Sequence, residues 1–218
     1  MFVLTIDQRG SQHSRDRVPE FLGLLGDVPA VMAFERSVGD EVQGVLDDPD
    51  AVVEVALRAL RAGHWYVGIG LGTVDLPLPA SPREASGTAF VAARRAVDRA
   101  KKTGERVPLS VQSGPRITSA ASPVSQDPAA AAEAVLVLTG NLVRTRSAAE
   151  WRVLDQLTPG ARGQQTAVAK ALEISPQAVS SAIFRAGWQE EQGGRSAAAL
   201  LLGLANHHAG MSEPGATL

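Results

Sequence analysis

The stretch VAKALEISPQAVSSAI at 168–183 decides how the C-terminal half of the chain folds. Its apolar residues have the spacing of two short helices that cross at a tight turn. Ser175 has a hydroxyl that can cap the second helix, and Pro176 suits the first helical position because the N–H that it lacks would be unpaired there. The pattern predicts a helix at 164–173 and a second helix at 176–186. The positions expected in contact are Val168, Ala169, Leu172, Ile174, Val179 and Ala182.

The polar face of the second helix carries the chemistry that DNA recognition needs. Amide, hydroxyl and guanidinium groups bind base edges and phosphates, and this face offers them at Gln177, Ser180, Ser181 and Arg185. The alternative is an ordinary helical hairpin with a solvated polar face. The stretch resembles helix-turn-helix units of the MarR type and of sigma-factor C-terminal regions, with Glu173 where many such turns carry glycine.

The flanking sequence predicts a winged helix-turn-helix domain. A helix at 148–157 precedes the motif, the segment GWQEEQGGR at 187–195 predicts a β-wing around two glycines, and an apolar helix at 196–205 is a candidate dimerisation or packing element. Arg162 and Arg185 would hold phosphates, and Arg195 of the wing would reach the backbone or minor groove. The full predicted DNA-binding set is Arg162, Gln164, Thr166, Ser175, Gln177, Ser180, Ser181, Arg185 and Arg195.

Composition limits the classes of function. The chain has 218 residues, 44% of them hydrophobic, which is ordinary for a globular protein. It has no cysteine, so disulfides and thiolate metal sites are excluded. A net charge of −2 excludes a strongly basic coat, so DNA binding requires a local patch of arginines: Arg144, Arg146, Arg152, Arg162, Arg185 and Arg195. The start MFVLTID lacks the pattern of a secretory or membrane segment, so we expect a cytoplasmic protein without membrane contact.

The N-terminal half alternates short β-type runs with helical patterns, which predicts an α/β (α+β) sandwich at 1–112. A Ser- and Pro-rich connection and an Ala-rich linking helix follow at 113–146. The all-α (winged) helix-turn-helix domain would occupy 147–205, and a disordered tail 206–218.

Two carboxylates stand out in this half. Asp7 ends the first strand and is followed by Gly10 and Ser11, and Asp40 lies between two short apolar runs that read as a hairpin. Carboxylates at the ends of adjacent strands can hold a divalent cation, and a glycine-containing turn can present N–H groups to phosphate. The alternatives are a helix cap for Asp7 and an ordinary turn for Asp40.

The order of these features resembles class III nucleotide cyclases and diguanylate cyclases, and most closely SatD-like proteins, which look like such a cyclase fold joined to a helix-turn-helix. The matching segments are Asp7 with Gly10-Ser11, then Gly39-Asp40-Glu41, Gly68-Ile69-Gly70 and GTAFVAARR at 87–95. The resemblance implies metal binding by Asp7 and Asp40, nucleotide contacts from Gly10, Ser11 and Arg36, and transition-state stabilisation by Arg94. Mg²⁺ with a nucleotide would be the cofactor.

This sequence departs from the cyclases at the position that orients the ribose. Cyclases carry asparagine there, whereas this chain has Phe90 or Val91, depending on the alignment. We therefore expect a catalytically degenerate cyclase-like domain that serves sensing or dimerisation in a transcriptional regulator. The regulator would bind double-stranded DNA as a homodimer, because one short helix reads too few base pairs. The alternative is an active metal-dependent nucleotidyl cyclase or nucleotide-binding enzyme that uses Asp7 and Asp40. A third possibility is that a nucleotide binds without turnover and changes the spacing of two DNA-binding units.

Overall fold

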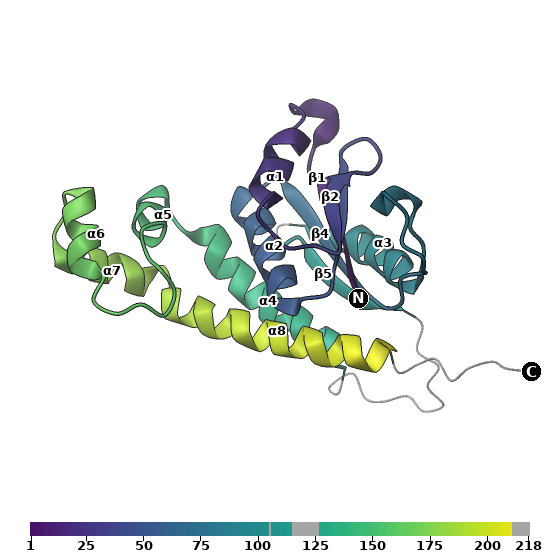
Figure 1. Cartoon of the computed structure of the whole chain (residues 1–218). Helices are drawn as coiled ribbons and strands as arrows, with labels where there is room; N and C mark the ends of the chain where they lie inside the picture. The colour runs from purple at the N-terminus through teal and green to yellow at the C-terminus, as the bar shows by residue number, and fades with distance from the viewer. Residues whose placement is uncertain (105, 115–126, 211–218) are drawn as a thin grey trace, which may run out of the picture.

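The computed structural model describes residues 1–104, 106–114 and 127–210 and combines a five-stranded sheet with helices (Figure 1). The strands have the spatial order β2-β3-β1-β4-β5, and every neighbouring pair is antiparallel except β4 and β5. Their bounds are β1 (Phe2–Gln8), β2 (Met32–Arg36), β3 (Glu41–Leu46), β4 (Trp65–Leu71) and β5 (Leu109–Ser113). The predicted mixed α/β architecture of the N-terminal half is confirmed.

Two helices connect the first four strands. The helix α1 (Val18–Leu25) joins β1 to β2, and α2 (Pro49–Ala62) joins β3 to β4. Because β1 lies between β3 and β4, and β3 lies between β1 and β2, each connection is a split β-α-β unit. This topology brings the end of β1 beside the β2–β3 hairpin, with Asp7 opposite Glu41.

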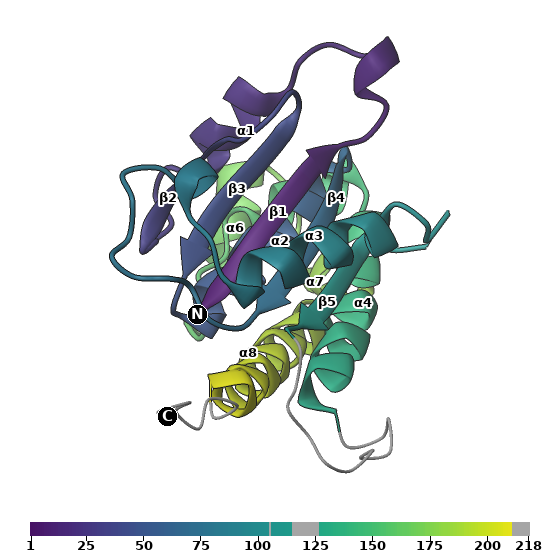
Figure 2. The ribbon, with the colours of Figure 1, turned by 90° about the vertical axis from the view of Figure 1, so that its right-hand side faces the viewer.

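Alternation along β1 divides the core between the two faces of the sheet. Phe2, Leu4 and Ile6 pack with α1, α2 and α4 (Pro128–Thr145), whereas Val3 packs on the opposite face with α3 (Thr88–Ala100). Figure 2 shows α3 on one side of the sheet and α2 on the other. A β-carbon on Gly70 would lie 2.2 Å from the carbonyl oxygen of Ala89, so α3 approaches β4 as closely as glycine permits.

The C-terminal helix corrects two predictions from the sequence. The β-wing at 187–195 and the short helix at 196–205 are replaced by one helix of 23 residues, α8 (Trp188–Gly210), which packs along α2 and α4. The physical reason lies in Gly194, where a β-carbon would be 2.3 Å from Oγ1 of Thr139 on α4. The glycine therefore serves a close helix–helix contact. Residues 206–210 of the predicted disordered tail are helical, and 211–218 lie outside the described residues.

The predicted linking helix is present as α4, capped at its start by Asp127, whose side chain accepts a hydrogen bond from the amide of Ala129. It does more than connect, because it covers β5 and lies against α8. Most of the predicted connection, 115–126, lies outside the described residues. Within the described part of the chain, no helix has both the length and the apolar character needed to cross a membrane.

A small three-helix lobe projects beyond the sheet (Figure 1). It consists of α5 (Ala148–Leu154), α6 (Gln165–Leu172) and α7 (Pro176–Arg185). Its own apolar core joins Val153 of α5, Val168 and Ala169 of α6, and Val179 and Ala182 of α7. The two helices predicted around the turn at 173–175 are confirmed, and so is the predicted contact between them.

Candidate nucleic-acid interface

The turn between α6 and α7 is built by three consecutive residues. Glu173 adopts the left-handed conformation, with φ of 54° and ψ of 42°, at the position where glycine is common. The amide of Ile174 then donates to the carbonyl of Ala169 at 3.0 Å, which closes the end of α6. Ser175 caps α7 as predicted, because its Oγ accepts a hydrogen bond from the amide of Ala178 at 3.1 Å. The polar start of α7 is thus fixed in place.

The outward face of α7 carries a stripe of three exposed side chains. Val179 and Ala182 face the core of the lobe, so Gln177, Ser181 and Phe184 point away from it at spacings of four and three residues. Ser180 lies at the side of this stripe and is also exposed. The predicted recognition residues of α7 are therefore exposed on the outer side of the lobe.

Phe184 is a candidate functional residue that the sequence reasoning missed. It is 83% exposed, which is the largest exposure of any large apolar side chain in the described residues. An isolated phenylalanine near the end of a helix reads as a core residue in sequence. The signal that could have found it is its spacing of seven residues from Gln177, which places it on the polar face.

Two predicted DNA-binding residues are engaged elsewhere. Gln164 holds the loop before α6, where its side-chain oxygen accepts from the amide of Thr158 at 2.7 Å and its nitrogen donates to the carbonyls of Thr158 and Ala161. Arg195 lies on a helix and not on a wing. Its guanidinium binds Glu191 at 2.7 Å and Glu54 at 2.5 Å, so it joins α8 to α2. Neither side chain is free for DNA.

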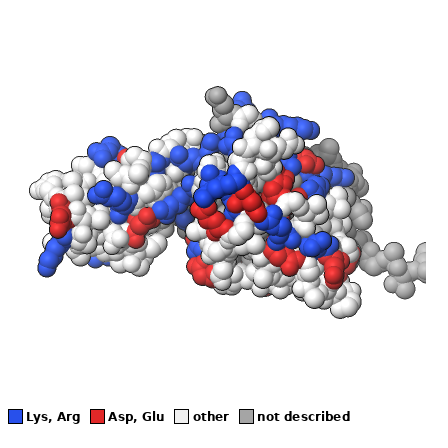
Figure 3. All heavy atoms as spheres, turned by 90° about the horizontal axis from the view of Figure 1, so that it is seen from above, with Lys and Arg blue, Asp and Glu red and all other residues white. Residues whose placement is uncertain are grey.

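The basic patch on the lobe is smaller than predicted. Arg146 is buried, and Arg195 is paired, which leaves four exposed basic residues in the lobe beside three acidic ones at 150, 155 and 173. Figure 3 shows basic and acidic side chains interspersed on the lobe. Arg185 lies 3.5 Å from Glu150 and keeps a side chain that is 64% exposed. The exposed basic residues are Arg152, Arg162, Lys170 and Arg185, and Thr166 is exposed near them.

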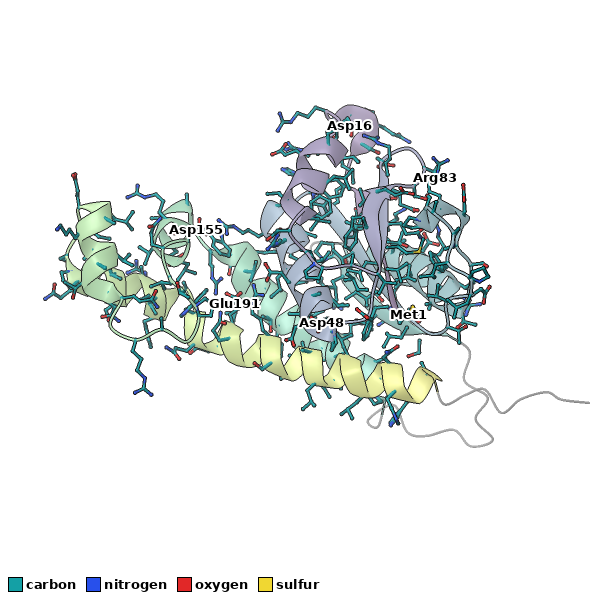
Figure 4. All side chains as sticks on the ribbon, in the orientation of Figure 1. Met1, Asp16, Asp48, Arg83, Asp155 and Glu191 are labelled. Atoms are coloured by element: carbon teal, nitrogen blue, oxygen red, sulfur yellow. The ribbon has the colours of Figure 1, made fainter. Side chains whose placement is uncertain are left out.

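Two arginines that contact the ring of Trp151 attach the lobe to the α/β unit. Trp151 of α5 has Arg61 of α2 at 3.8 Å from its ring centroid and Arg146 at 4.8 Å. Arg61 also makes a bidentate ion pair with Asp155 at 2.7 and 2.8 Å. Figure 4 shows Asp155 and Glu191 in this region, where a cleft of about 980 Å³ lies between the lobe and the helices α1 and α2. These contacts set the orientation of α7.

The second candidate site, at the end of β1, is a set of paired charges. Asp7 binds Nζ of Lys101 at 2.8 Å, and Glu41 binds Arg94 through two hydrogen bonds of 2.6 and 3.0 Å. Burial raises the pKa of Asp7 despite the opposing effect of Lys101, and the nearby Asp40 raises it further. Burial also raises the pKa of Glu41, although Arg94 opposes the shift. Arg94 therefore serves as the partner of Glu41 in this structure.

The remaining residues of the predicted nucleotide site lie around this cluster. Gly10 is in the left-handed conformation before a short 3-10 helix that starts at Ser11. Arg36 donates to Asp16 at 2.5 Å and to the carbonyl of Gly39 at 2.6 Å. Asp7 is paired with Lys101 in this structure, and the described residues contain no group of three or more His, Cys, Asp or Glu that could hold a metal ion. Binding of Mg²⁺ by Asp7 and Asp40 stays a prediction.

Comparison of the chain with models of protein families, with curated proteins and with solved structures found no match.

Proposed function

We propose that the chain is a DNA-binding transcriptional regulator that reads double-stranded DNA with α7. The observation that carries this proposal is the exposed stripe of Gln177, Ser181 and Phe184 on a capped helix that follows a tight turn. An amide and a hydroxyl hydrogen-bond to base edges, and an aromatic side chain contacts the 5-methyl group of thymine. In this proposal Arg162 and Arg185 hold the phosphates on either side.

The α/β unit takes a sensory role in this proposal. It holds the lobe through Arg61, Trp151 and Arg146, so a change in the α/β unit alters the orientation of α7. The paired charges around Asp7 and Glu41 support a role without catalysis, because each carboxylate already has a cationic partner.

The test is binding of the purified protein to labelled genomic fragments, measured by fluorescence anisotropy at about 50 mM and about 200 mM salt. We expect selective binding to a few fragments. Gln177→Ala should abolish selectivity and leave the salt dependence unchanged. Arg185→Ala should weaken binding to every fragment and reduce the salt slope by about one per chain.

Arg83→Ala is the matched control, because Arg83 is exposed on the α/β unit, away from the lobe (Figure 4). It should leave both affinity and salt slope unchanged. Binding that is equally weak for all fragments and vanishes at the higher salt would refute the regulator. An Arg185→Ala effect confined to one fragment, without a change in salt slope, would refute the phosphate role of Arg185.

A separate assay decides between this proposal and an enzyme. The protein is incubated with ATP or GTP and Mg²⁺ or Mn²⁺, and we expect no turnover because Asp7 is engaged by Lys101. Turnover that Asp40→Ala abolishes would make nucleotide chemistry the primary function.

A further inference from the structure

An uncharged apolar surface runs along the outer side of two packed helices. Ala131 and Leu138 of α4 and Ala197, Leu200 and Leu204 of α8 are exposed on it, and the partly buried Val135, Leu142 and Leu201 lie beside them; we name this surface the α4–α8 face. Leu138 is 71% exposed, Leu200 66% and Leu204 46%. About half or more of each of these three leucine side chains is exposed, so their burial in their own chain contributes little to its stability. A cluster of exposed leucines indicates a surface that binds a partner.

The contacts between the two helices make this surface continuous. A β-carbon on Gly187 would lie 3.3 Å from Leu142, and one on Gly194 would lie 2.3 Å from Thr139, so α4 and α8 run antiparallel. Leu138 precedes Thr139, and Ala197 follows Gly194 by one helical turn. The outward positions of the two helices therefore meet along their length. In Figure 1 α8 lies on the outer side of the molecule.

The chemistry of the face selects its partner. Residues 196–209 of α8 contain no Asp, Glu, Lys or Arg. The sole such residue of α4 before Arg144 is Glu133, which turns away to bind Arg99 and the amide of Val111. A nucleic acid or a strongly charged protein would find no charged side chain to pair with on such a surface. A twofold pair places identical residues opposite each other, and a neutral apolar face is complementary to itself.

The size of the face fits a reversible dimer. The uncharged stretch 196–209 spans about 21 Å of helix, and two packed helices are about 20 Å wide, which gives a footprint of about 420 Å² per chain and about 840 Å² in total. This total lies below the area of about 1,000 Å² at which stable interfaces begin and is typical of weak, transient association. The lobe ends at Ala186, and α8 begins directly after the next residue, Gly187. The helix that carries this face therefore continues from the lobe.

We propose that the α4–α8 face binds a second copy of this chain and so brings two copies of α7 together. The role of this dimer rests on the proposed function, because two recognition helices would read two DNA half-sites. The dimer itself does not depend on DNA binding, so the two ideas fail separately.

The test is sedimentation velocity of the full chain from about 1 to about 200 µM. We expect a concentration-dependent dimer. In Leu200→Glu/Leu204→Glu, carboxylates of the two chains oppose each other, and the dissociation constant should rise at least about a hundredfold. Val91→Glu is the control, because Val91 is 49% exposed on α3, on the other side of the sheet. It should dimerise like the wild type.

A second measurement guards against a folding defect. The chain has no cysteine, so Ala197→Cys introduces a single thiol on the face. Under mild oxidation it should form a disulfide-linked dimer, whereas Val91→Cys should stay a single chain. A wild type that remains monomeric at 200 µM overturns the proposal, as does a dimer that survives both glutamates. A dimer that binds no DNA refutes the proposed function and leaves this inference standing.

Discussion

The buried ion pair beneath the lobe gives the sharpest test of how the two units are joined. Arg146 binds Glu191 at 2.5 Å, both side chains are 1% exposed, and Arg146 also donates to the carbonyl of Ala186 at 2.8 Å. Arg146→Met leaves a buried carboxylate with Arg195 alone and a buried carbonyl without its donor. We expect the free energy of unfolding to fall by about 3–5 kcal/mol. For a chain of this length that lowers Tm by about 6–20 °C.

The assay is urea denaturation followed by circular dichroism, with a thermal scan beside it. Arg144→Met is the control, because Arg144 is half-buried near the same end of α4 and should change stability by less than about 0.5 kcal/mol. The double variant Arg146→Met/Glu191→Leu removes both charges and should recover about 2 kcal/mol of the loss. A loss below about 1 kcal/mol in the single variant, or a double variant no more stable than the single one, would refute the reasoning.

Four further predictions use other parts of the molecule. Gly193→Ala should raise stability by about 0.5–1 kcal/mol, because a β-carbon there meets nothing within 4 Å, whereas Gly194→Ala should lower it by about 1–3 kcal/mol; urea titration measures both. Glu173→Gly should raise stability by about 1 kcal/mol in the same assay, since its backbone is left-handed. Burial raises the pKa of Glu41 above its ordinary value although Arg94 opposes it, so the wild type loses stability as pH rises from the ordinary pKa through the raised one; over that rise the free energy of unfolding of Glu41→Gln should gain on that of the wild type. Replacing thymine by uracil in a bound fragment should weaken binding about fourfold for the wild type and leave Phe184→Ala unaffected, as measured by anisotropy.

The sequence predicted the elements whose signals are local. Ser175 and Pro176 placed the start of α7, and short β-type runs between helical patterns placed β1 and its neighbours. It failed at 187–195, because adjacent glycines at 193 and 194 normally interrupt a helix. The reason for Gly194 is Thr139, which lies 55 positions earlier and meets it only after α4 and α8 pack together.

The candidate sites show the same limit. Sequence spacing placed Gln177 and Ser181 on one exposed face of α7. Phe184 has the same spacing, but its apolar type gave it no place in the predicted site, and the packing of Val179 and Ala182 on the opposite side leaves it exposed. Whether a charged side chain is free also depends on residues that are distant in sequence. Arg195 is engaged by Glu54, 141 positions away.

Only Ala186 and Gly187 separate α7 from α8, so a movement of the last helix would pass directly to α7. Gly187 joins a lobe to a helix of 23 residues, which is about 34 Å long. A tilt of about 5° about the far end of such a helix moves its start by about 3 Å, close to the rise of one base pair. If α7 binds DNA as proposed, a tilt of this size about the end near Asn206 would move it by about one base-pair step.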